Sequence, residues 1–360
     1  MKKPLVVAGT LAIMITMGAC AANESDTSDT TNSVSGTLNA GGASSMTAAQ
    51  EAWRAGFQNA NSAATVNYDP TGSGTGRQNF VDGGYLFAGT DSPFKADEAS
   101  GPFAACAQDS ALVQIPVYIS PIAVGFTLSG IDTLNLDAET IARIFTGAIT
   151  KWNDPAISAQ NAGVTLPSTA ITAVHRSDKS GTTENFTDYL AKAAPAVWTF
   201  GSEQTWPEGL GGEAAEKTQG VRETVSGTEG AIGYLDASQA EQMGTVAVKV
   251  GDNYESISAQ AAASVVGKSP LETGRGATDV VVDLDRTLTE SGTYPVVLVS
   301  YIAACGTYAN PQEGTLVKSY LTYVVSPEGQ EAAANNAGSA PITGDPNLAA
   351  KVTAAVNEIS

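Results

Sequence analysis

Strand-like and helix-like segments alternate along most of this 360-residue chain, and this alternation restricts the folds open to it. The strand-like segments are residues 36–42, 64–69, 85–90, 112–126, 170–174, 230–236 and 294–305. The helix-like segments are residues 45–60, 77–84, 137–147, 184–193, 220–227 and 315–337. Alternation of this kind predicts an α/β fold built on mixed, mostly parallel sheets.

The charge balance narrows the classes of partner. The chain has 37 Asp+Glu against 18 Lys+Arg, and its formal net charge is −19. This balance disfavours nucleic acid as a partner, because a phosphate backbone requires a basic face. The chain also has a single His and no Cys-x-x-Cys pair. A zinc or similar metal site therefore has few ligands to be built from, and we expect neither a metal nor a cofactor.

The N-terminus has the pattern of an export signal. Lys2 and Lys3 precede an apolar stretch that ends in small residues before Cys20. The stretch is short for a membrane span, so we interpret residues 1–19 as a signal peptide. The sequence MGAC resembles a bacterial lipobox and predicts lipidation at Cys20; the alternative is an ordinary secretory signal with an incidental Cys. Residues 20–36 are polar and predict a flexible tether.

Two further cysteines remain once Cys20 is set aside. They are Cys106 and Cys305, and an exported protein meets an oxidising compartment. A disulfide between them is one interpretation, and two separate buried thiols are the other.

Three of the predicted helices begin in stretches rich in Ser, Thr and Gly. Ser44 and Ser45 lie at the first, residues 71–76 (TGSGTG) precede the second, and residues 180–183 (SGTT) precede a third. Each start offers unpaired backbone N–H groups at the positive end of a helix dipole, with hydroxyl groups beside them. Such ends bind anions, although Ser and Thr are also ordinary helix caps.

A fixed cation lies next to the third of these starts, in the stretch HRSDKSGTT. Arg176 is always charged, and its guanidinium group can hold an oxyanion through two hydrogen bonds. Asp178 is placed to hold that guanidinium in position or to form a turn. The combination favours a site that binds an oxyanion.

The signatures of nucleotide sites and serine hydrolases are missing. The stretch GSGTGRQ lacks the Lys-Ser/Thr of a P-loop and is not G-x-G-x-x-G. The chain has no G-x-S-x-G motif, and its only imidazole, His175, directly precedes Arg176. On a strand the two side chains would point to opposite faces. We interpret His175 as a packing or surface residue and predict no catalytic residue.

These residues resemble the phosphate-binding protein family of ABC phosphate-uptake systems. The most specific stretches are VHRSDKSGTTENFTDYL and IFTGAITKWNDPAI. GGASS, VNYDPTGSGTG, FAGTDSP, EGAIGYLD and LVKSYLTYVVSPEGQ follow the family's order, so that the resemblance extends from about residue 36 onward. It implies a two-lobed, type II-like periplasmic-binding-protein fold with the ligand in the cleft between the lobes. Residues 37–118 and 298–360 would form lobe one, and residues 119–297 lobe two.

The resemblance also implies a ligand set. Carried over by motif, the phosphate-binding residues are Ser44, Ser45, Ser73, Asp91, Arg176, Ser180, Gly181 and Thr182. Asp178 would be the partner of Arg176. Ser44 and Ser45 stand where the family often has Thr-Phe, which keeps a backbone N–H contact but removes an aromatic cover. The stretch GLGGEAAEKTQG differs from the family's Lys-Gly-Asn pattern as well.

Asp91 is predicted to select the ligand. An ionised Asp only accepts hydrogen bonds, so it can receive one from the O–H of phosphate. Sulfate has no proton to give near neutral pH and would leave a buried acceptor unpaired beside a like charge. The alternative is that Asp91 caps the turn DSPF.

The function implied by the resemblance is that of a receptor without a chemical step. It would bind inorganic phosphate, deliver it to an ABC permease, and be held by lipid on the periplasmic or cell-surface face of the cell membrane. Two alternatives stay open: a receptor for another oxyanion such as sulfate or molybdate, and a secreted phosphatase on the same scaffold.

Overall fold

The computed structural model describes residues 34–360. The predicted signal peptide at 1–19, the predicted lipidation site Cys20 and most of the predicted tether at 20–36 lie outside the described residues. Among residues 34–360, none of the helices combines the length and the apolar character that a membrane crossing needs.

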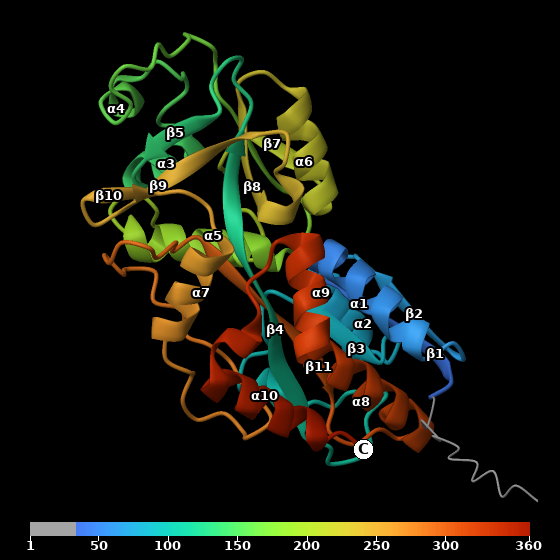
Figure 1. The fold of residues 1–360 in the computed structure, drawn as a ribbon. Coiled ribbons are helices and arrows are strands. Elements are labelled where there is room, and N and C mark those ends of the chain that lie inside the picture. The colour runs from blue at the N-terminus through green and yellow to red at the C-terminus, as the bar shows by residue number, and fades with distance from the viewer. Residues whose placement is uncertain (1–33) are drawn as a thin grey trace, which may run out of the picture. The chain divides into compact units, whose positions relative to one another are not determined.

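Strands and helices alternate through the described residues (Figure 1). The strands are β1 (Gly36–Gly42), β2 (Ala64–Asp69), β3 (Phe87–Thr90), β4 (Leu112–Phe126), β5 (Thr133–Leu136), β6 (Thr172–Arg176), β7 (Glu213–Ala215), β8 (Ala231–Asp236), β9 (Gly244–Val250), β10 (Asn253–Glu255) and β11 (Val297–Cys305). Hydrogen-bonded neighbours follow the order β2-β1-β3-β11-β4-β8-β6-β7, and β9 pairs with β4, β5 and β10.

Helices cover these strands. The α-helices are α1 (Thr47–Ala60), α2 (Ser73–Val81), α3 (Ala138–Phe145), α4 (Pro155–Ser158), α5 (Gly181–Ala193), α6 (Lys217–Gly227), α7 (Ala259–Lys268), α8 (Pro311–Val325), α9 (Pro327–Ala337) and α10 (Pro346–Asn357). Short 3₁₀ helices are η1 (Ser44–Met46), η2 (Glu98–Ser100), η3 (Ala237–Gln239) and η4 (Ile342–Gly344).

The long strand β4 belongs to two sheets. Its residues 112–121 pair with β11, whereas residues 122–126 pair with β8. Figure 1 shows the strand passing from the neighbourhood of β11 to that of β8. Every residue of β4 is buried, as its run of apolar side chains requires. The strand therefore links the two halves of the fold.

Strand β11 lies between β3 and β4 and is antiparallel to both. Its register against β4 shifts between Ser300 and Tyr301, which is the mark of a β-bulge. The last residue of the strand, Cys305, forms a disulfide with Cys106 across a sequence separation of 199 residues. The disulfide interpretation of these two cysteines is thus confirmed.

Antiparallel pairing is more extensive than the sequence predicted. The mixed character of the sheets is confirmed, and β1–β2, β1–β3, β5–β9, β6–β7 and β6–β8 are parallel. The expectation of mostly parallel sheets is not met, because β4 and β11 run against each of the strands they pair with.

The second predicted helix begins earlier than expected. The sequence predicted a Gly-rich turn over residues 71–76, but α2 starts at Ser73. Gly72 has a φ of +93°, a conformation that favours glycine, and it turns the chain into the helix. A Cβ atom on Gly72 would also lie 2.6 Å from Oδ2 of Asp178, so a larger residue would push that carboxylate away.

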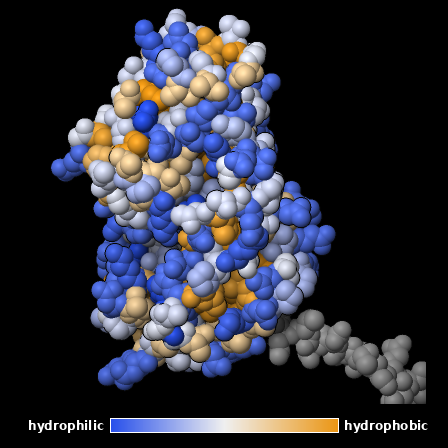
Figure 2. Space-filling model, turned by 90° about the vertical axis from the view of Figure 1, so that its left-hand side faces the viewer, coloured by the Kyte–Doolittle hydropathy of each residue, from blue (hydrophilic) through white to orange (hydrophobic). Residues whose placement is uncertain are grey.

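The core is apolar and the surface largely polar. Trp53 and Phe57, one turn apart on α1, are both buried, and Trp53 Nε1 donates to Gly329 O of α9 at 2.7 Å. Figure 2 shows a face on which hydrophilic residues predominate and hydrophobic ones lie in small, separated areas.

Candidate oxyanion-binding site

Asp91 is a buried carboxylate surrounded by hydroxyl groups. It directly follows β3 and is 3% exposed. Its Oδ1 atom accepts hydrogen bonds from the hydroxyls of Ser45 and Ser300, both at 2.7 Å. Its Oδ2 atom accepts one from Thr182 at 3.0 Å. The three donors come from η1, β11 and α5, which are distant in sequence.

The protonation of Asp91 reflects two opposing effects. Burial raises the pKa of its carboxyl above the ordinary value, because a low-dielectric environment disfavours charge. The hydrogen bonds from Ser300, Ser45 and Thr182 and the positive charge of Arg176 act in the other direction. The net pKa is raised, but less than burial alone would raise it.

Arg176 is held rigidly at the end of β6. It is 2% exposed, and its Nε and Nη2 atoms donate to the two carboxylate oxygens of Asp178 at 2.7 and 2.5 Å. Asp178 Oδ1 also accepts from the backbone N–H of Lys217 at 3.0 Å. Burial raises the pKa of Asp178, but the hydrogen bonds and charge of Arg176 outweigh it, so the pKa is lowered. This geometry leaves Nη1 of the guanidinium for another acceptor.

The start of α5 lies against Asp91. Ser180 is the N-cap and its Oγ accepts from Thr183 N–H at 3.2 Å. The first turn leaves the amides of Gly181 and Thr182 without an intrahelical acceptor. A Cβ atom on Gly181 would lie 2.7 Å from Cβ of Asp91, so only glycine permits this approach. Ser180 was predicted as a ligand; its hydroxyl here caps the helix.

The other two predicted serines occupy different positions. Ser73 Oγ accepts from the backbone N–H of Asp91 at 3.2 Å, so it lies beside this carboxylate. We call the group formed by Asp91, Arg176, the start of α5 and the side chains that hydrogen-bond them the cluster. Ser44 Oγ instead contacts Thr218 Oγ1 of α6 at 3.0 Å and accepts from Thr218 N–H at 3.2 Å. Thr218 follows Lys217, whose amide holds Asp178. Ser44 thus joins the cluster through α6 rather than through Asp91.

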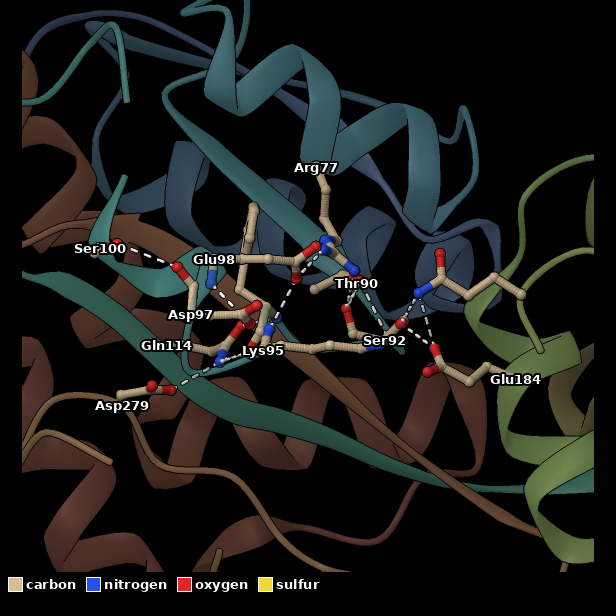
Figure 3. A network of polar contacts seen from close by, with 12 residues as sticks. Arg77, Thr90, Ser92, Lys95, Asp97, Glu98, Ser100, Gln114, Glu184 and Asp279 are labelled. Carbon is tan, nitrogen blue, oxygen red and sulfur yellow. Dashed lines mark hydrogen bonds and ion pairs between the residues drawn. The ribbon is translucent and has the colours of Figure 1, made fainter. Parts of the chain in front are cut away.

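A second polar network borders the cluster (Figure 3). Ser92, next to Asp91, donates to Glu184 Oε2 of α5, and Gln204 Nε2 donates to the same oxygen at 3.0 Å. Burial raises the pKa of Glu184, and the hydrogen bonds from Ser92 and Gln204 oppose that rise. Asn185 Nδ2 donates to Asp91 O at 2.8 Å, which fixes α5 against the loop after β3.

Ser300 and Thr218 were missed by sequence reasoning. A serine within the apolar strand VLVSYIAAC is the one local signal for Ser300, because a buried hydroxyl needs a partner. Thr218 lies in the region where the sequence departs from the family pattern, and nothing local distinguishes it. His175, in contrast, stacks on Trp206 with ring centroids 4.8 Å apart, which confirms that it is a packing residue.

The cluster suits an oxyanion that carries a proton. It offers as donors a guanidinium, two helix-start amides and the hydroxyls of Ser73 and Ser180, which accept hydrogen bonds and keep their own protons. The Asp91 carboxylate is the acceptor for an O–H group. Within residues 34–360, no group of three or more His, Cys, Asp and Glu side chains is arranged to hold a metal ion.

The fold and this cluster define a two-lobed binding protein, and sequence comparison agrees. Residues 27–328 match the PBP superfamily domain. The phosphate-binding protein PstS2 of Mycobacterium bovis is 33% identical over 99% of this chain and 97% of its own length. PstS 3 of Mycobacterium tuberculosis is 34% identical over 90% of this chain and 87% of its own length. The chain belongs to the family of these phosphate-binding proteins.

A solved structure shares the fold. A high affinity periplasmic phosphate-binding protein bound with phosphate matches with a TM-score of 0.71 at 23% identity, over 89% of this chain and 93% of that protein. The expected two-lobed periplasmic-binding-protein fold is thereby confirmed.

Proposed function

We propose that this protein binds inorganic phosphate between its two lobes and passes it to an ABC permease. The observation that carries the proposal is the buried cluster in which Asp91, Arg176 and the start of α5 meet. The lobes would be residues 37–118 with 298–360 and residues 119–297. Family membership supports phosphate as the ligand, because the relatives are phosphate-binding proteins.

Each part of the cluster has a role in this proposal. Arg176 supplies the fixed positive charge, and Asp178 orients it. The amides of Gly181 and Thr182 donate at the helix start. The remaining proposed ligands, with hydroxyl groups or backbone N–H groups as donors, are Ser44, Ser45, Ser73 and Ser180. Asp91 accepts the proton of the bound phosphate.

Closure follows from the placement of these groups. Ser45, Ser73 and Asp91 belong to proposed lobe one, whereas Arg176 and Thr182 belong to proposed lobe two. A ligand that contacts both sets favours the closed arrangement, because only that arrangement satisfies all of its hydrogen bonds. Binding and closure are then one process without a chemical step.

The Asp91→Asn variant tests the ligand assignment and the predicted selectivity together. Calorimetric titrations of the wild type with phosphate, arsenate, sulfate and molybdate should show tight phosphate binding that a large excess of sulfate barely displaces. A site built on one hydrogen bond can discriminate by about 10⁴–10⁵. In the variant the amide can donate to sulfate, so the ratio of phosphate to sulfate affinity should narrow.

The outcomes separate the alternatives. Sulfate or molybdate competing with phosphate at similar concentration in the wild type would make the protein a receptor for other oxyanions. An unchanged ratio in the variant would keep phosphate and return Asp91 to the role of a turn cap. Turnover of a chromogenic phosphate ester would favour the phosphatase alternative, and we expect none.

The cellular setting has its own test. We propose export under the signal at residues 1–19 and lipid attachment at Cys20, which would hold the protein on the outer face of the cell membrane. The Cys20→Ser variant should lose lipid label and appear in the soluble extracellular or periplasmic fraction. Retention of the variant in the membrane fraction would argue against the lipid anchor.

A further inference from the structure

The hydrogen bonds around Asp91 divide its two oxygens unequally. Oδ1 accepts from Ser45 and Ser300 at 2.7 Å each, and Oδ2 accepts only from Thr182 among the described residues, at 3.0 Å. An ionised carboxylate offers about four acceptor positions, two on each oxygen. Oδ1 is therefore saturated, and one position remains on Oδ2.

The two donors on Oδ1 are fixed by the fold. Ser300 is 0% exposed and lies on β11 directly before the register shift, at which β4 carries the extra residue Val117. Ser45 is 1% exposed and belongs to η1, just before α1. Both hydroxyls are buried against the carboxylate, and neither can turn to bulk water.

Resting on the proposed function, we propose that Ser45 and Ser300 are specificity-determining residues that act through Asp91. By donating to Oδ1 they keep the carboxylate an acceptor and leave one place, on Oδ2, for the proton of the bound oxyanion. They position Asp91 and need not touch the ligand through their hydroxyls. Thr182 donates to the same Oδ2 and borders the remaining place.

The physical reason is that a buried carboxylate without donors takes up a proton. Burial raises the pKa of Asp91, and the hydroxyls of Ser300 and Ser45 oppose that rise. Once protonated, Asp91 would donate a hydrogen bond, which fully ionised sulfate can accept. Without the two hydroxyls, Asp91 should become protonated at a higher pH than in the wild type. The site should therefore bind sulfate already at that higher pH.

The other titratable groups near Asp91 are the same in the wild type and in every variant. The guanidinium of Arg176 on β6 acts on Asp91 as a fixed positive charge. Tyr68 of β2 remains neutral, because burial raises its pKa well above the ordinary value. Glu184 of α5 lines the same cavity as Asp91 and is present in every variant. Phosphate itself titrates, but equally for wild type and variants.

The test is a calorimetric competition of phosphate against sulfate from pH 5 to 9. Ser45→Ala/Ser300→Ala should narrow the affinity ratio by about tenfold or more, because hydrogen bonds to charged groups are being removed. As pH is lowered, the ratio of phosphate to sulfate affinity should also begin to decrease at a higher pH than in the wild type. Ser300→Thr, which keeps the hydroxyl, should retain the wild-type profile.

Ser120→Ala is the matched control. Ser120 is a 0% exposed serine beside another buried carboxylate, Asp236, and it is not in the proposed site. Removing the Ser120 hydroxyl should leave both the ratio of phosphate to sulfate affinity and its pH dependence unchanged. If the double variant fails to fold, the single variants Ser45→Ala and Ser300→Ala answer the question, since each should move the profile part of the way.

The outcomes distinguish this inference from the proposed function. Wild-type selectivity and pH profile in the foldable variants would overturn the role of Ser45 and Ser300 while leaving phosphate binding in place. Failure of the wild type itself to prefer phosphate over sulfate would overturn the proposed function, and this inference with it. Narrowing by Ser120→Ala to the same extent would also overturn the specific role of the two serines.

Discussion

Arg176 supplies a buried positive charge whose position Asp178 fixes. Arg176→Ala would remove the proposed charge-assisted hydrogen bonds to phosphate, worth roughly 1.5–3 kcal/mol each, so affinity should fall at least about tenfold. Calorimetric titration measures this loss. The exposed Arg143 of α3 offers a matched control, and Arg143→Ala should bind as the wild type does. Equal affinity in the two variants would remove Arg176 from the site.

The sequence predicted the residues of this site that lie in local motifs. Asp91, Arg176 and Gly181 belong to short stretches with a family resemblance, and the structure brings them together. Ser300 lies 209 residues from Asp91, so its hydrogen bond depends on the whole sheet being assembled. The family resemblance predicts that Ser45 removes an aromatic cover over the ligand, and the structure shows in addition that the Ser45 hydroxyl donates to Asp91.

Among the elements, β8 ends in a buried acid. Asp236 is 0% exposed, contacts the Tyr118 hydroxyl at 3.1 Å, and accepts from Ser238 N–H at 3.0 Å. Burial raises the pKa of Asp236 to about 6. Between roughly pH 4 and 6 the folded state therefore binds more protons than the unfolded state, so this residue's contribution to stability decreases as pH rises.

Asp236→Asn should remove the pH dependence that Asp236 gives to the free energy of unfolding. The amide stays neutral, and its oxygen still accepts from Ser238. The unfolding free energy of the variant relative to the wild type should rise by roughly 2–3 kcal/mol between pH 4 and 7. Urea unfolding at several pH values measures the difference, in which the other carboxyl groups cancel. A difference that does not vary with pH would contradict the prediction.

The disulfide closes the end of β11, away from the proposed site. Cys305 is five residues from Ser300 along the strand, roughly 17 Å at about 3.3 Å per residue. Replacing both Cys106 and Cys305 by Ala should lower the unfolding free energy by up to about 4–5 kcal/mol. Phosphate affinity should stay within about twofold at a temperature where the variant is folded. A large loss of affinity would show that the bond also shapes the site.

Long elements were predictable and short ones were not. The apolar run at 112–126 predicted β4 to the residue, and the stretch at 180–183 predicted the start of α5 to within a few residues. Strand β7 has the sequence EAA, which carries no strand preference and forms because β6 offers its edge. The extent of antiparallel pairing depends on where β11 inserts, which no local pattern encodes.

At the scale of the whole molecule, the contact between Ser92 and Glu184 joins the two proposed lobes outside the proposed ligand set. Under the proposed closure, Ser92→Ala would remove a contact made only when the lobes are closed, so the affinities for phosphate and sulfate should fall in the same proportion. Their ratio should stay constant, in contrast to the effect expected for Asp91→Asn. Paired titrations with both anions measure this.

Ser129 provides the comparison, because its hydroxyl donates to Glu229 at 3.0 Å within one proposed lobe. Ser129→Ala should change neither affinity. A change of the ratio in Ser92→Ala would assign Ser92 to ligand selection instead of closure.

The position of β11 between β3 and β4 also bears on how the chain is made. The first sheet consists of β1, β2, β3, β11 and the first part of β4. Four of these strands are translated by residue 126, but β11, which lies between β3 and β4, ends only at Cys305. A nascent chain therefore carries an incomplete first sheet while nearly all of the second is being synthesised. Neither proposed lobe can be obtained by cutting the gene at one point, and a fragment that stops before residue 297 should depend on chaperones until the missing strand is supplied.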